Sequence, residues 1–171
     1  MPMQFRITRE EMLMGSKHDS IKVKGVFRLQ IEEDGAIVGD SGWNSNLITT
    51  DGFNNFLAKA LGASAGSSQI GFVALGTGSA PASNATSLDQ ELPNSKRAAV
   101  TFASSTNSKA AVFTATFQSS NSFLGAQSNL SNIGLFASSS GGTLFAGTTY
   151  TSSACATNQN VNVTYQLNFT S

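Results

Sequence analysis

The chain has 171 residues, no net formal charge at pH 7 and 12% charged residues, well below the roughly 25% that is usual for globular proteins. Its length suits one domain, and 12 phenylalanines supply a real core, which excludes a disordered chain. Zero net charge argues against non-specific nucleic-acid binding, no apolar run approaches a membrane span, and a single cysteine excludes an internal disulfide framework.

Residues 1–20 are predicted to form an extended N-terminal arm, because charged and apolar residues mix there without a clear period. The segment lacks the apolar core of a signal peptide. Basic residues outnumber acidic ones through Arg28, which would suit docking on an acidic neighbouring subunit. An ordinary solvated terminus is the alternative. The single histidine, His18, is in this arm, and an exposed side chain is the simplest interpretation of it.

Short segments with strand-like patterns follow the arm. Residues 21–31 alternate between apolar and polar side chains, with Gly25 expected at a bulge, and Asp34-Gly35 favours a hairpin turn into residues 36–38. Further strands are predicted over 70–75, 96–103, 110–118, 133–137, 143–149 and 161–169. The last has the clearest period of two. This pattern predicts one antiparallel β-sandwich or jelly-roll-like domain over residues 21–171.

One α-helix is predicted within the strands, over about residues 51–61. Apolar residues share one face at helical spacing: Phe53, Phe56, Leu57, Ala60 and Leu61. Asp51 or Thr50 is expected to cap the first turn, and Gly62 suits the residue after the last turn. We expect the apolar face to pack against the end or face of the β core.

The sequence shows no convergent set of residues for catalysis, for a cofactor or for a metal ion. Cys155 lies among serines and threonines and is expected to pack rather than react. The acidic group at residues 32–34 is interpreted as a solvated turn, because adjacent strand residues point opposite ways. Residues 75–78 lack the rest of a phosphate-binding motif, so their two glycines are assigned to an abrupt turn. No enzymatic activity is expected.

The second half of the chain has an unusual surface composition. After Lys109 there is no aspartate, glutamate, lysine or arginine. Soluble monomers usually keep a mixed charged surface. Either a polar surface of serine, asparagine and threonine suffices here, or this half of the chain meets other protein.

Three segments have a pattern that resembles virion proteins of tailed bacteriophages: NLITTDGFNNFLAKALG (46–62), FVALGTGSAPASNATSLDQEL (72–92) and NIGLFASSSGGTLFAG (132–147). The opening EEMLMGSKHDSIKVKGVFRLQI (10–31) is similar to the arm and first strand of phage capsid cement, or decoration, proteins. Similar stretches occur in phage tail and fibre proteins. The chain departs from the pattern at Asn132, where glutamate is usual, and at Gly147, where a basic residue is usual.

The resemblance implies a non-enzymatic virion protein that is made in the host cytoplasm and binds the capsid exterior. It would bridge major capsid subunits, as a homo-oligomer (dimer or trimer), without membrane, cofactor or specific nucleic acid. Contacts are expected from the arm, the first strand's basic edge and the loop over 79–92, through Arg6, Arg9, Met12, Met14, Lys17, Lys22, Lys24, Pro81 and Leu88. Uncharged faces can pack between subunits without the cost of desolvating charge.

Two other functions are compatible with the sequence. A tail, baseplate or fibre-attachment protein would share the resemblance. A carbohydrate-binding β-sandwich would instead use Trp43 and Tyr150 to stack on sugar rings. Exposed, neighbouring aromatic rings would favour this function, and a buried Trp43 would contradict it.

Overall fold

The computed structural model describes residues 21–57, 69–93, 96–103 and 109–170, so the N-terminal arm lies outside the described residues. The described chain is mainly antiparallel β-structure, as predicted, with ten strands and little helix. The strands are β1 (Lys22–Glu33), β2 (Ala36–Asp40), β3 (Asn44–Ile48), β4 (Phe72–Gly76), β5 (Ala98–Ala99), β6 (Thr101–Ala103), β7 (Ala110–Phe117), β8 (Ser128–Phe136), β9 (Leu144–Cys155) and β10 (Asn160–Thr170). The helical segments are η1 (Gly52–Leu57) and η3 (Ser119–Asn121).

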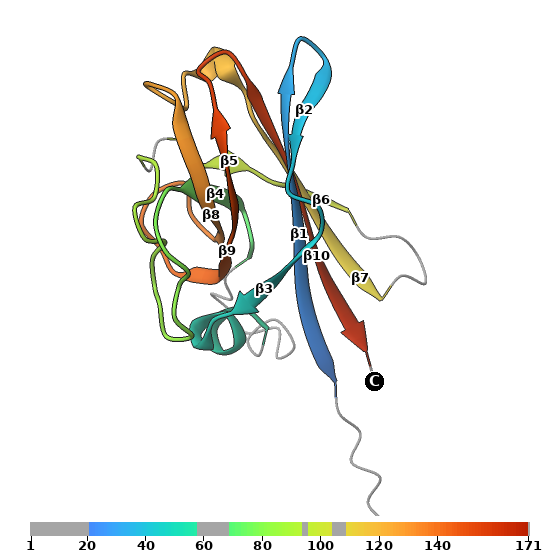
Figure 1. The fold of residues 1–171 in the computed structure, drawn as a ribbon. Coiled ribbons are helices and arrows are strands. Elements are labelled where there is room, and N and C mark those ends of the chain that lie inside the picture. The colour runs from blue at the N-terminus through green and yellow to red at the C-terminus, as the bar shows by residue number, and fades with distance from the viewer. Residues whose placement is uncertain (1–20, 58–68, 94–95, 104–108, 171) are drawn as a thin grey trace, which may run out of the picture.

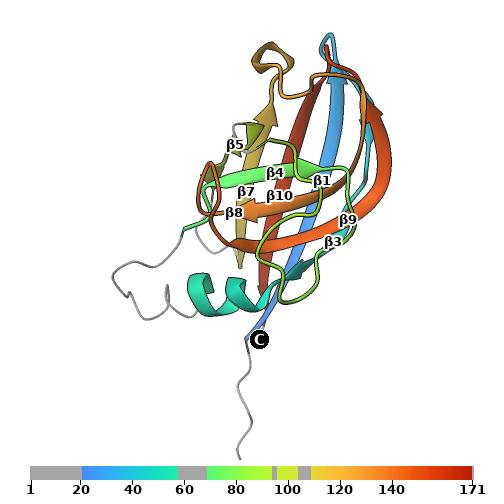
Figure 2. The same ribbon diagram turned by 90° about the vertical axis from the view of Figure 1, so that its left-hand side faces the viewer.

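The strands form two layers that are continuous with each other (Figure 1). One layer, sheet A, has the order β3-β1-β10-β7-β6, with β2 also paired to β1. The other, sheet B, has the order β5-β4-β8-β9-β3. The short strand β3 pairs with both β1 and β9 and so joins the layers. Figure 2 shows the strands of sheet B crossing those of sheet A, as in a strongly twisted sandwich.

The side of the sandwich opposite β3 is nearly closed as well. A single residue, Val100, separates β5, which pairs with β4, from β6, which pairs with β7. The Val100 N–H donates to the carbonyl of Gly71 at 2.9 Å, which fixes this crossing. The described chain therefore forms a flattened, nearly closed barrel, which leaves few strand edges free.

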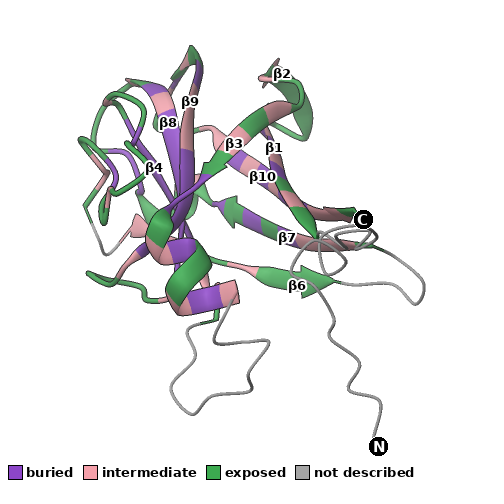
Figure 3. Cartoon of the chain, turned by 90° about the horizontal axis from the view of Figure 1, so that it is seen from below, coloured by how far each residue is buried: buried purple, intermediate pink, exposed green. Residues whose placement is uncertain are grey.

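The core lies between the two sheets and follows from the period of two in the strands. Inward residues of β10 (Val161, Val163, Tyr165 and Leu167) are at most 2% exposed, and their partners on β1 are equally buried. The rings of Phe27 and Tyr165 stack at 6.4 Å, and Tyr150 of β9 packs edge-on against Phe27 at 5.6 Å. Figure 3 shows buried residues on strands of both sheets.

The helix differs from the prediction in type and in its cap. Residues Gly52–Leu57 form a π-helix, and residues 58–68, with the expected Ala60, Leu61 and Gly62, lie outside the described residues. The cap is Thr49 rather than Asp51 or Thr50: its hydroxyl accepts the Gly52 N–H at 3.0 Å and donates to the Leu144 carbonyl at 2.6 Å. The Thr49 side chain thus ties the helix start to β9.

The buried face of the helix is only partly as predicted. Phe56 is 3% exposed, and its ring meets that of Phe145 edge-on at 5.1 Å. Phe53, expected beside it, is instead 46% exposed. The wider turn of a π-helix changes which positions share a face, so spacing for an α-helix misplaces Phe53.

Replacing Phe56 with alanine is expected to lower the free energy of unfolding by about 3–5 kcal/mol, because it leaves a cavity among buried rings. Phe53→Ala, on the same helix, is the matched control and should cost about 0.5 kcal/mol or less, as for other surface positions. Urea denaturation of the full chain measures both. Equal effects of the two substitutions on the free energy of unfolding would show that Phe56 does not pack in the core.

Of two local predictions about β1 and its hairpin, one was wrong. Gly25 is not at a bulge, since β1 pairs with β10 in an unbroken register; the bulge lies against β2, between Ile31 and Glu32. Gly25 instead makes room for Asn46, whose amide lies where a β-carbon on residue 25 would be. The Asp34-Gly35 turn is confirmed, with φ of 49° and 80°.

Candidate interaction surfaces

The outer side of β10, β7 and β6 is an uncharged surface of the described chain. We call it the neutral face and define it by the side chains that alternate with the buried ones: Thr101, Ala103, Val112, Thr114, Thr116, Asn162, Thr164, Gln166 and Asn168. The register places these residues in rows across the sheet, with Thr114 opposite Thr164 and Val112 opposite Gln166. Each is exposed or half-buried.

Hydrogen bonds between side chains order part of the neutral face. The Thr116 hydroxyl donates to Asn162 Oδ1 at 2.8 Å, and Asn162 Nδ2 donates to Glu32 Oε2 at 2.7 Å. Gln166 Nε2 donates to Asn168 Oδ1 at 2.7 Å. Because these side chains are already held, docking another protein on them would cost less conformational entropy than ordering free side chains.

The predicted basic edge of the first strand is present but short. Lys22 and Lys24 are exposed at the start of β1. Arg28, further along the strand, forms an ion pair with Asp40 of β2, whose carboxylate also accepts from the Gly42 N–H. The Arg28 guanidinium and the Gly42 N–H hold the pKa of Asp40 well below its usual range. Lys22 and Lys24 therefore remain as the exposed basic residues of this strand.

The loop after β4 does not present the residues that were predicted to contact a partner. Pro81 is buried and Leu88 is 4% exposed, packed with Phe136 and Leu144. Because their burial is within the chain itself, they hold the loop in place and are not available as contacts.

The two departures from the phage pattern lie under this loop. Asn132 is fully buried, and its amide donates to the backbone carbonyls of Ser79 and Asp89 at 3.2 and 2.8 Å. A β-carbon at Gly147 would lie 3.0 Å from the ring of Pro81. Asn132 and Gly147 therefore allow the loop after β4 to pack against the sheet, and neither position carries a charge.

The two glycines of residues 75–78, Gly76 and Gly78, leave room for the same loop to pack closely. A β-carbon at Gly76 would collide with the Asn132 side chain, and one at Gly78 would lie 2.5 Å from the Asp89 backbone. The Asp89 carboxylate accepts from both the N–H and the hydroxyl of Ser79, at 2.8 and 2.7 Å. The interpretation as an abrupt turn, rather than a phosphate site, agrees with this packing.

The Ser79 bonds to Asp89 predict acid sensitivity. They lower the pKa of Asp89 below its ordinary value of 3.8, so the carboxylate stabilises the fold above that value and loses this effect as the pH falls through the lowered pKa. We expect the free energy of unfolding to decline from about pH 5 downwards, and less steeply in Asp89→Asn. Urea denaturation over this pH range measures both slopes. Parallel curves would contradict a role for Asp89.

The acidic group at the end of β1 is hydrogen-bonded rather than simply solvated. Glu33 accepts hydrogen bonds from the side chains of Gln159 and Asn158, both at 2.8 Å, which lower its pKa. Glu32 accepts from Asn162. These carboxylates attach the β1–β2 hairpin to the turn before β10 and to β10 itself.

The aromatic pair proposed for sugar binding is not assembled. Trp43 is 53% exposed, but Tyr150 is 8% exposed and packs inside the core against Phe27. Burial raises the pKa of both Tyr150 and Tyr165. Trp43 is therefore exposed as this function would need, but Tyr150 is not available to form a stacking pair with it.

Cys155 behaves as predicted, as a small packing residue. It is fully buried, and burial raises the pKa of its thiol to about 11. A thiol with so high a pKa stays protonated and is a poor nucleophile at neutral pH.

The described residues contain no group of three or more histidine, cysteine, aspartate or glutamate side chains placed to hold a metal ion. Within the same residues, no helix is long and apolar enough to cross a membrane. The predicted arm contacts Arg6, Arg9, Met12, Met14 and Lys17, like His18, lie outside the described residues.

Comparison with protein-family models, curated proteins and solved structures finds no match for this chain.

Proposed function

We propose that this protein is a non-enzymatic structural component of a tailed-bacteriophage virion that binds the capsid exterior and bridges neighbouring major capsid subunits. The observation that supports this proposal best is the neutral face. Its side chains offer amide and hydroxyl groups for hydrogen bonds, and none carries a charge. Docking confined to these side chains would desolvate no ion of the face itself. The charged residues that border it are Lys24, Arg28 and Glu32 of β1, opposite Asn168, Thr164 and Asn160.

Several copies of the neutral face in one oligomer would make binding to the shell strong enough. Each uncharged contact is weak by itself, but a closed homo-oligomer presents several copies of the face to a symmetric shell. The second contact then forms at a high effective concentration, so avidity exceeds the affinity of one site. A dimer or trimer of the chain is accordingly part of the proposal.

Basic residues at one end of the molecule would add to this contact. Lys22 and Lys24 are exposed where β1 begins, and Arg6, Arg9 and Lys17 precede them in the sequence. A basic arm of this kind would favour an acidic rim on the shell and would speed association at low salt. Its contribution would fall as the salt concentration rises.

The copy number of the chain in purified virions tests the proposal. Quantitative mass spectrometry against the major shell protein should give a number near that of the shell subunit. A handful of copies would move the protein to the tail, baseplate or fibre attachment, which is the alternative with the same resemblance. Absence from the particle would overturn both assignments.

A further inference from the structure

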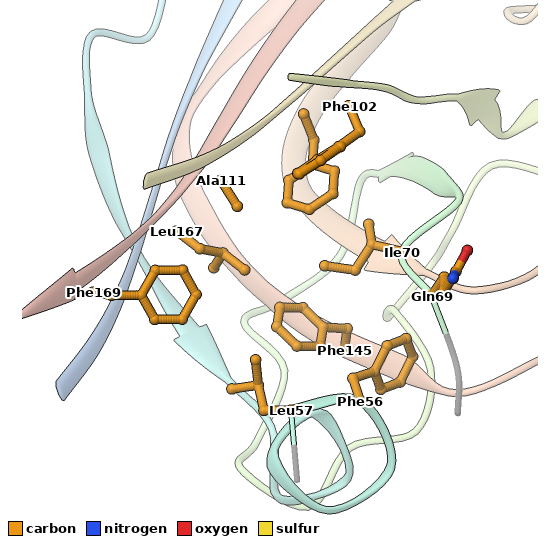
Figure 4. A pocket seen from close by; sticks show the side chains of 10 residues that line it. Phe56, Leu57, Gln69, Ile70, Phe102, Ala111, Phe145, Leu167 and Phe169 are labelled. Carbon is orange, nitrogen blue, oxygen red and sulfur yellow. The ribbon is translucent and has the colours of Figure 1, made fainter. Parts of the chain in front are cut away.

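An apolar groove opens at the end of the sandwich where β1 begins and η1 lies. Its volume is about 430 Å³, and it is lined by residues of both sheets and of the helix: Phe56, Leu57, Gln69, Ile70, Phe102, Ala111, Phe113, Phe145, Leu167 and Phe169. Figure 4 shows these side chains converging from several directions. We call this the end groove; five of its residues are phenylalanines.

Apolar side chains remain exposed at this end of the described chain. Phe102, on the groove wall, is 59% exposed, although its ring lies 5.3 Å from that of Phe113. Ile21, which immediately precedes β1, is 74% exposed. Rings left open to water in this way favour an apolar occupant.

We propose that the end groove holds Met12, Leu13 and Met14 of the same chain. Outside the described residues, large apolar side chains are concentrated in the arm, where Met1, Met3, Phe5 and Ile7 precede Met12, Leu13 and Met14. Of these, residues 12–14 lie nearest in the sequence to β1. Residues 58–68 contain only Leu61, and residues 104–108 contain none. The arm therefore has the composition that the groove requires.

The length of the arm supports the assignment to the same chain. Residues 15–20, which link Met14 to Ile21, can span at most about 20 Å. The groove residues of β10 and β7 lie one and two strands away from β1, which is about 5 and 10 Å across the sheet. Along the strands, Phe169 and Leu167 lie opposite Val23 and Gly25, about 7 and 13 Å beyond Ile21. A segment tethered this closely has a high effective concentration at the groove, so the contact needs no second molecule.

The side chains of the arm also suit the aromatic rings of the end groove. All four methionines of the chain lie within its first 14 residues. Methionine is flexible enough to fill an irregular groove, and its sulfur makes favourable contacts with aromatic rings. Met12 and Met14 would thus contact their own domain rather than the shell, leaving Arg6 and Arg9 to reach outward. This inference concerns the isolated protein and does not rest on the proposed function.

Methionine-methyl NMR on the full chain tests the inference. With selectively labelled methyl groups, Met12 and Met14 should be shifted upfield by ring currents and should show contacts to phenylalanine protons. Met1 and Met3, in the same arm, serve as internal references near the positions of an unfolded peptide. Peroxide oxidation followed by mass spectrometry should be several-fold slower at Met12 and Met14 than at Met1 and Met3.

Phe102→Ser provides the control, because an exposed wall residue can be made polar while the core stays intact. Its spectrum should keep the dispersion of the folded domain but return Met12 and Met14 to the unfolded positions. If all four methionines already coincide in the unaltered chain, the inference is wrong. It is also wrong if the shifts disappear on dilution together with an oligomer, because the arm would then occupy the groove of a second copy.

Discussion

Replacing Arg97 with alanine is expected to lower the free energy of unfolding by about 3–5 kcal/mol, because it strips a buried carboxylate of its partner. Arg97 is 3% exposed, and its guanidinium donates to both carboxylate oxygens of Glu91, at 2.6 and 3.0 Å. It also donates to the carbonyls of Ser138 and Gly141, at 2.8 and 2.7 Å, and lies 3.6 Å from the centre of the Phe136 ring. One side chain thus joins the loop after β4 to the β8–β9 turn.

Arg28→Ala is the matched control for this experiment. The Arg28 and Asp40 side chains are 39% and 31% exposed, so removing that solvent-screened ion pair should lower the free energy of unfolding far less than Arg97→Ala does. The double change Arg97→Met with Glu91→Leu should recover part of the loss, because no unpaired charge remains buried. Urea denaturation measures all three variants. If Arg97→Ala lowers the free energy of unfolding no more than Arg28→Ala does, the Arg97–Glu91 ion pair does not have this stabilising role.

The parts of the fold that could be predicted from the sequence are those in which the strand pattern and the burial agree. β10 and the β1–β2 hairpin were found because each inward residue is apolar and the turn carries Asp34-Gly35. β3 was missed for the opposite reason. Its inward Asn46 is polar and fills the space above Gly25, whereas its Leu47 is 41% exposed. A tertiary contact, rather than a local preference, makes this segment a strand.

Irregular pairing obscured the other strand limits. The strand predicted over 133–137 omits the start of β8 at Ser128, because a shift in register between Leu130 and Asn132 breaks the alternation there. The helix cap was missed because Thr49 is fixed by β9, which lies almost a hundred residues later in the chain. Such pairings depend on the closed sandwich and leave no local signal.

The interaction surface was only partly predictable. The lack of charge after Lys109 indicated a surface that could meet protein, but the register of β10 with β7 was needed to show which side chains share one face. The end groove was not predicted at all. Its phenylalanines come from five segments far apart in the sequence, and nothing in the spacing of Phe56, Phe102 and Phe169 indicates that they meet.

A charge placed on the neutral face should abolish most of the proposed binding to the shell, whatever its sign. Thr114 lies in the middle of the face, opposite Thr101 on one side and Thr164 on the other. Both Thr114→Lys and Thr114→Glu would bury an unpaired ion on docking, at a cost of about 2–5 kcal/mol, or a loss of affinity of roughly 30- to 5,000-fold. Cosedimentation with purified shells that lack the protein measures this loss.

The same two changes at Ser139, an exposed residue in the β8–β9 turn on the other sheet, are the matched control and should leave binding within about twofold, since a charge that stays in water costs little. Opposite effects of lysine and glutamate at position 114 would show that charge complementarity, not an uncharged contact, governs docking. Unchanged binding in both variants would remove the neutral face from the interface. Equal losses with either sign require that the face is desolvated in the complex, because only desolvation penalises both charges alike.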